Sequence, residues 1–221
     1  MRHPLTLSAI LVALAATPLL AQRDRAGLSV FAGPTLSWFG GSDASTSSPR
    51  VGVALGLHVH SPLGKGVSID PDLTFAYKGA DLTAQAGSGV EGVLTAQLWY
   101  LELPVLLRYS IGRPGAFRFR FYGGPYIAVR AGCTGRIQVN DSSYSRSCSE
   151  FPDPADTSQT FDPFVGWDAG VVVGTGTGIP LLGTRLEIDL RYEQGFVNLE
   201  RQSSGGALYN QAFLLVVGVP F

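Results

Sequence analysis

Strict alternation of apolar and polar residues over positions 184–196 is the clearest structural signal in this chain. Leu186, Ile188 and Leu190 would lie on one face of an extended strand, and Glu187 and Asp189 on the other. A helix would scatter these charges around its surface. The charged face is too polar for a soluble core and the apolar face too apolar for water. This pattern therefore predicts a strand with lipid outside and a polar interior.

Further alternating segments recur along the chain, each with a polar side. Together they predict eight strands, over residues 28–38, 51–60, 67–78, 95–109, 117–131, 164–175, 184–196 and 208–221. The connections alternate between long (40–50, 79–94, 132–162, 197–207) and short (61–66, 110–116, 176–183).

Long loops at one end and short periplasmic turns at the other are typical of transmembrane barrels. Closure is expected because lipid cannot satisfy the backbone groups of an open sheet edge. The predicted fold is all-β: an eight-stranded antiparallel transmembrane β-barrel. Its narrow lumen would be polar and filled by side chains.

Aromatic residues near the strand ends indicate two girdles at the lipid interfaces. Trp99 and Tyr109 lie ten residues apart on one strand. At about 3.3 Å per residue and a tilt near 40°, this separation spans about 25 Å, the height of an apolar membrane band. The expected girdle residues are Trp38, Trp99, Tyr109, Trp167, Tyr192 and Phe221.

The first 21 residues have the pattern of a secretory signal peptide. Arg2 and His3 precede an apolar run that includes Pro18 and ends at Ala21. The run is shorter than the roughly 20 residues of a membrane span, which disfavours an anchor helix. We expect cleavage near Ala21, and a single barrel domain over residues 22–221 in the bacterial outer membrane.

Composition adds little beyond this class. The net charge is −1 and basic runs are absent, so nucleic acid is not an expected partner. We expect the outer face of the barrel wall to contact outer-membrane lipid. No cofactor and no nucleotide or phosphate motif is expected.

Charged residues on the inner faces of the predicted strands balance, seven cations against seven anions. Unpaired buried charges would cost several kcal/mol each, so we expect a paired network that fills the lumen rather than an ion or proton path. The network comprises Asp70, Asp72, Lys78, Glu102, Arg108, Arg118, Arg120, Arg130, Asp168, Arg185, Glu187, Asp189, Arg191 and Glu193.

His58 and His60 stand two apart on one predicted strand and so share a face. This spacing can hold a metal, with Asp70 or Asp72 on the neighbouring strand as a third ligand. The favoured interpretation is a lumen pair hydrogen-bonded to carboxylates, with no metal.

Cys133 and Cys148 are the only cysteines, and both fall in the longest predicted loop, 132–162. The oxidising compartment favours a disulfide between them. Such a staple is worth about 3 kcal/mol to loop order in the chain-entropy model. Loops carry function where the wall faces lipid, so this loop is the expected contact surface.

Several motifs resemble those of the PorT-like outer-membrane β-barrel family. They are YLELPVLLRY at 100–109, GPY at 124–126, DAG at 168–170 followed by Gly174 and Gly176, RY at 191–192, GFVNL at 195–199 and, more loosely, YKGA at 77–80. The resemblance implies an eight-stranded outer-membrane barrel without catalytic residues. A few relatives serve protein secretion or adhesion at the cell surface.

The expected function is a structural or surface-interaction role, accessory to protein secretion or adhesion, with a surface or periplasmic protein partner contacted through the loops. The alternatives are a small channel or passive transporter and, less favoured, a lipid-active outer-membrane enzyme. Balanced lumen charges disfavour the channel. An enzyme would need a Ser, a His and a carboxylate in mutual reach, and the histidines lie away from the rim, so no enzyme is expected. A soluble lipocalin-like barrel would place apolar side chains inside, where this chain has charges.

Overall fold

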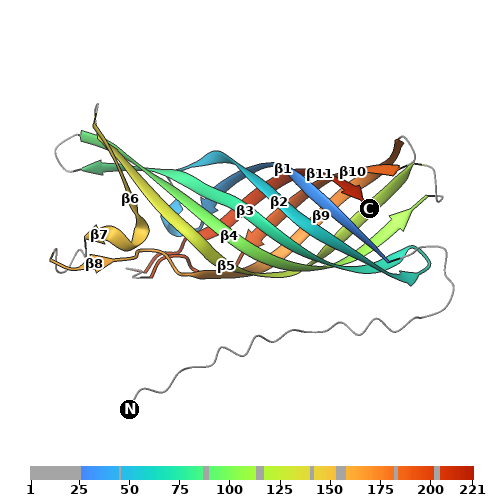
Figure 1. Ribbon diagram of the computed structural model, residues 1–221. Coiled ribbons are helices and arrows are strands. Elements are labelled where there is room, and N and C mark those ends of the chain that lie inside the picture. The colour runs from blue at the N-terminus through green and yellow to red at the C-terminus, as the bar shows by residue number, and fades with distance from the viewer. Residues whose placement is uncertain are drawn as a thin grey trace, which may run out of the picture.

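The computed structural model describes residues 26–44, 46–86, 90–112, 117–139, 142–152, 158–181, 184–201 and 205–221. Eight antiparallel strands close into a barrel, which confirms the predicted fold (Figure 1). The barrel strands are β1 (Gly27–Gly40), β2 (Ser47–Gly64), β3 (Val67–Ala86), β4 (Val90–Ile111), β5 (Arg118–Val139), β9 (Trp167–Leu181), β10 (Thr184–Gly195) and β11 (Tyr209–Pro220).

Smaller elements lie between the barrel strands at one end: η1 (Ser42–Ala44), β6 (Ser142–Ser147), η2 (Cys148–Glu150), β7 (Phe151–Pro152) and β8 (Thr160–Phe161). In the described part of the chain, no helix has the length and apolar character needed to cross a membrane. The predicted signal peptide, residues 1–21, lies outside the described residues.

Each barrel strand pairs with its neighbours along the chain, and β11 pairs with β1 to complete the circle. The closing ladder runs from Ser29 opposite Pro220 to Gly40 opposite Tyr209. Closure satisfies the backbone groups of every barrel strand internally, as a lipid environment requires. The short turns and the C-terminus lie together at one end of the barrel, on the right in Figure 1.

Strands β3, β4 and β5 are much longer than predicted. They have 20, 22 and 22 residues, whereas a tilted strand crosses the membrane in about 9–11. The predicted loop 79–94 is therefore wrong, since β3 continues to Ala86 and β4 starts at Val90. The strands extend past the lipid because the backbone ladder between them continues in water without needing an apolar outer face.

Other boundaries shift for similar reasons. The first long connection shrinks to 41–46, and β9 starts at Trp167 and runs to Leu181 instead of ending at 175. Glycines on β9 allow long side chains of neighbouring strands to cross the lumen: a Cβ on Gly174 would lie 2.5 Å from the Tyr122 ring, and one on Gly176 would lie 1.9 Å from the Asp189 carboxylate. Small residues on this strand thus make room for the polar interior.

Inner and outer faces divide as the alternation predicts. Outward side chains such as Leu55, Leu107, Phe119 and Val173 are exposed. The interior is less uniformly polar than expected, because apolar side chains share it with the charges. The buried apolar residues include Phe31, Ala54, Ala76, Leu106, Val172, Leu214 and Val216.

Candidate functional site

Lys78 lies at the centre of the lumen, and its side chain points inward from β3. Its Nζ lies 2.6 Å from the Glu102 carboxylate and 2.5 Å from that of Glu193. All three side chains are buried. The ammonium also faces the Tyr126 ring at 5.3 Å, within cation–π range. One cation therefore holds strands β3, β4 and β10 together across the interior.

A second layer lies toward the short-turn end. Arg191 pairs with Asp72 at 2.7 Å, and Arg108 pairs with Asp70 at 2.7 Å. Asp72 also contacts His58 Nδ1 at 2.5 Å. The favoured sequence interpretation, a histidine pair hydrogen-bonded to carboxylates, matches this arrangement, and His58 and His60 join the charge network as members that the fourteen predicted residues did not include.

Arg120 forms a further layer on the other side of the lumen, where it pairs with Glu187 and, at 2.8 Å, with Asp189. Arg118 on β5 and Arg185 on β10 are half-buried nearby, on the two strands that flank β9. Glu187 is the more exposed of the two carboxylates, with 16% of its side chain accessible against 7% for Asp189.

Asp168 is held by neutral donors. Tyr126 Oη donates to it at 3.0 Å and Asn210 Nδ2 at 2.9 Å. Arg130, close by, pairs instead with Asp162 from the third connection. Sequence reasoning missed both Asn210 and Asp162 as partners. Asn210 could have been found, because it falls on the inner face of the alternating last strand.

An apolar cluster lies at the long-loop end of the lumen. Phe39, Leu98 and Leu208 are buried there, and Leu199 and Phe164 reach it from the connecting segments. The rings of Phe39 and Phe164 lie 6.2 Å apart. Backbone hydrogen bonds from Val165 to Leu199 and from Leu199 to Leu208 fix these segments across the barrel end. We call this set the apolar cap.

The predicted girdle residues divide between the two ends of the barrel. Trp38 packs with Tyr192 and Phe213, and Trp99 packs against Phe75 and Tyr77, all toward the long-loop end. Trp167, opposite Val129, is also at this end. Tyr109, opposite Val67, and the terminal Phe221 lie at the short-turn end.

The third connection is not the simple loop that was expected. Beyond the barrel, β5 continues to Val139, turns back as β6 and forms a ladder from Thr134 opposite Ser147 to Val139 opposite Ser142. We call β5 from Thr134 onward together with β6 the outer hairpin; Figure 1 shows it projecting from the end opposite the short turns. Among the described strands, β6 pairs with β5 alone and forms the sheet edge.

The predicted disulfide between Cys133 and Cys148 is confirmed. Cys133 is on β5 at the base of the outer hairpin, and Cys148 begins η2 and is buried against the apolar cap. The bond therefore fixes the returning end of the hairpin to the barrel end, rather than only closing an exposed loop.

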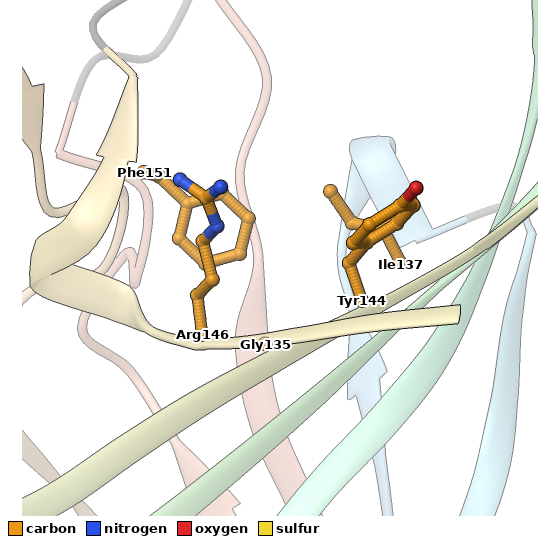
Figure 2. Close-up of a pocket in the computed structure, with 5 residues that line it drawn as sticks. All are labelled: Gly135, Ile137, Tyr144, Arg146 and Phe151. Atoms are coloured by element: carbon orange, nitrogen blue, oxygen red, sulfur yellow. The ribbon is translucent and has the colours of Figure 1, made fainter. Parts of the chain in front are cut away.

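A pocket with a volume of about 300 Å³ lies on the outer hairpin. Its walls are paired across the ladder, with Ile137 opposite Tyr144 and Gly135 opposite Arg146. Phe151 packs directly over Gly135, where an added Cβ would lie 2.4 Å from the ring. Figure 2 shows the Arg146 guanidinium near the Phe151 ring, with Tyr144 beside Ile137. The pocket thus offers aromatic and aliphatic surface together with one cation.

Comparison with protein families identifies the family of this barrel. The family model described as outer membrane protein beta-barrel domain matches residues 20–201. The chain belongs to this family. As an outer membrane beta-barrel domain protein, it is assigned to the bacterial outer membrane, in agreement with the apolar outer face of its barrel.

Solved outer-membrane barrels resemble this family member at low identity. Ail, the attachment invasion locus protein of Yersinia pestis, is 11% identical with a TM-score of 0.43, over 90% of this chain and 100% of that one. OprG from Pseudomonas aeruginosa is 12% identical with a TM-score of 0.48, over 89% and 97%. Neisserial surface protein A is 9% identical with a TM-score of 0.46, over 90% and 100%. Comparison with curated proteins finds no match.

Proposed function

We propose that this outer-membrane barrel is a surface-interaction protein, and that the outer hairpin is the surface that contacts a protein partner. The observation that carries the proposal is the preformed pocket between Ile137, Tyr144, Arg146 and Phe151. Tyrosine and arginine are enriched where binding energy concentrates in protein interfaces. Here Tyr144 is 67% exposed and free to be covered.

The chemistry of the pocket indicates the kind of segment it would bind. Its apolar walls suit an aliphatic or aromatic side chain, and Arg146 suits a carboxylate next to it. The neighbouring β6 edge offers backbone groups to an extended chain. An extended segment that adds to a sheet edge and places alternate side chains in a pocket is a common recognition mode.

The disulfide supports this role through preorganisation. Because Cys133–Cys148 ties the base of the hairpin to the barrel end, the pocket exists before contact and less conformational entropy is lost on binding. The resemblance to PorT-like barrels favours a partner in protein secretion or adhesion. We propose a binding role rather than catalysis, and a filled barrel rather than a transport path, because ion pairs and the apolar cap occupy the interior.

Site-specific photo-crosslinking in native membranes tests the proposal. A photoreactive residue at Tyr144, inside the pocket, should crosslink to a defined partner, while one at Ser143, on the opposite face of β6, should do so much less. Gly135→Val should abolish the Tyr144 crosslink, because the new side chain displaces Phe151. Ser145→Ala, on β6 next to Tyr144, is the control and should leave the Tyr144 crosslink unchanged.

Barrel assembly in each variant is checked by the change in gel migration on boiling. Equal crosslinking from positions 143 and 144, or a crosslink that survives Gly135→Val in an assembled barrel, would contradict the pocket as the contact site. Identification of the crosslinked protein then separates a secretion component from an external adhesion partner.

A further inference from the structure

Three potential metal ligands converge inside the barrel at the short-turn end. His58 and His60 point inward from β2, and Asp70 points inward from the neighbouring β3. Their ligand atoms all lie within 4.8 Å of one another. His60 Nδ1 is 3.0 Å from one Asp70 oxygen, and His58 Nε2 is 3.6 Å from the other.

His58 is held with one ring nitrogen directed at this cluster. A carboxylate only accepts hydrogen bonds, so the 2.5 Å contact means that His58 Nδ1–H donates to Asp72. Asp72 is fixed in turn by Arg191 Nη1 at 2.7 Å. His58 Nε2 is left buried, with no hydrogen-bond partner among the described residues. A histidine whose other nitrogen is held by a carboxylate is the usual arrangement behind a metal ligand.

Asp70 is oriented from behind as well. Arg108 Nε lies 2.7 Å from its Oδ2, and Ser68 Oγ donates to the same oxygen at 3.1 Å. The Ser61 backbone N–H donates to Oδ1 at 3.2 Å. These contacts fix the carboxylate with Oδ1 beside the His60 ring.

The local charges decide which ions suit the cluster. Asp70 and Asp72 are balanced by Arg108 and Arg191, so the site has no excess negative charge to attract a hard cation such as Ca²⁺ or Mg²⁺. Two imidazole nitrogen ligands instead favour a borderline transition metal. His60 is near the short turn between β2 and β3, and 27% of its side chain is exposed. An ion would therefore reach the cluster from the short-turn end, which is periplasmic in such barrels.

We propose that His58 Nε2, His60 Nδ1 and Asp70 bind one zinc-class divalent ion at the periplasmic end of the lumen. Zinc bonds nitrogen and oxygen at about 2.0–2.1 Å, so tetrahedral ligand atoms lie about 3.3 Å apart. His60 Nδ1–H donates to Asp70 Oδ1 without the ion, so binding would move this proton to Nε2 and free Nδ1 for the metal. Rotation of the partly exposed His60 ring would close the remaining separation. Water would take the fourth position, as in sites with three protein ligands.

Metal titration of the assembled barrel, purified in detergent without a histidine tag, tests the site. Zn²⁺ is expected to bind with one-to-one stoichiometry by calorimetry and to raise the thermal unfolding temperature. Co²⁺ bound in place of Zn²⁺ should give the visible absorption bands of a four-coordinate Co²⁺ ion. His60→Gln should weaken Zn²⁺ binding at least about tenfold and remove the Co²⁺ bands.

Two further variants keep the test decisive. Val59→Ala, between the two histidines but on the outward face of β2, leaves the ligands in place and should bind Zn²⁺ as the unmutated protein does. His58→Gln should lose binding like His60→Gln, and both are compared only as assembled barrels. No one-to-one binding to the unmutated protein, or equal binding to His60→Gln, would overturn the proposal.

Discussion

Lys78 stabilises the centre of the interior, because one buried ammonium compensates two buried carboxylates. Glu102 and Glu193 approach it from different strands, and each is buried. Breaking a buried pair costs more than the pair contributes, because the remaining charges stay in a medium that does not solvate them. Loss of Lys78 is therefore expected to destabilise the barrel through the two glutamates that it leaves without a cation.

We expect Lys78→Met to lower the free energy of unfolding by about 3–5 kcal/mol, since it leaves Glu102 and Glu193 facing each other without a cation. Urea unfolding in detergent, followed by the loss of the fast-migrating unboiled band, measures the change. The only other lysine, Lys65, lies in a turn at positive φ, where asparagine is tolerated. Lys65→Asn is the control and should change stability little; a similar loss in both variants would contradict the central role of Lys78.

At the scale of elements, the outer hairpin behaves as an extension of the barrel sheet. Strand β4 pairs with β5 as far as Gly92 opposite Val139, and β6 adds to the outer part of β5. The hairpin is therefore supported along one edge by β4 and fixed at its base by the Cys133–Cys148 bond. The other edge, along β6, remains available to a partner.

The double variant Cys133→Ser/Cys148→Ser should assemble into a barrel but loosen the hairpin. A staple over this separation of 15 residues is worth about 3 kcal/mol to local order. Hydrogen exchange of β6 amides should become faster, while exchange in β10, which has no contact with the bond, should not change. Unchanged exchange in β6 would mean that pairing with β5 alone orders the hairpin.

At the scale of the whole molecule, side chains occupy the barrel interior in successive layers. The apolar cap lies at the long-loop end, Lys78 and its glutamates occupy the centre, and the Asp70 and Asp72 pairs lie toward the short turns. An eight-stranded barrel leaves an interior that side chains fill.

Planar-bilayer recordings should therefore show no steady large conductance from the unmutated protein. Leu98→Ala, which trims the apolar cap, should also stay closed, because the ion-pair layers beneath it still fill the lumen. Reproducible open-channel currents from the unmutated barrel would favour the transporter alternative.

The sequence by itself determined the barrel and its two faces, because strand periodicity assigns every second side chain to lipid or lumen whatever the partner strands are. This is why residues 184–196 sufficed to predict an apolar wall and an inward row of charges. The disulfide could be predicted for another reason, because the only two cysteines share one connection in an oxidising compartment. The PorT-like resemblance was finer than the family that the comparison supports.

Only the tertiary structure decided which inward residues meet, since partners such as Lys78 and Glu193 are 115 positions apart and their contact depends on strand register. It also decided where strands end, because a ladder in water continues for as long as a neighbour supplies hydrogen bonds, a condition that hydropathy does not encode. The outer hairpin and its pocket arise from that pairing, which no local pattern specifies. For His58 and His60, whose shared face the strand period predicts, the register decided that Asp70 completes the cluster.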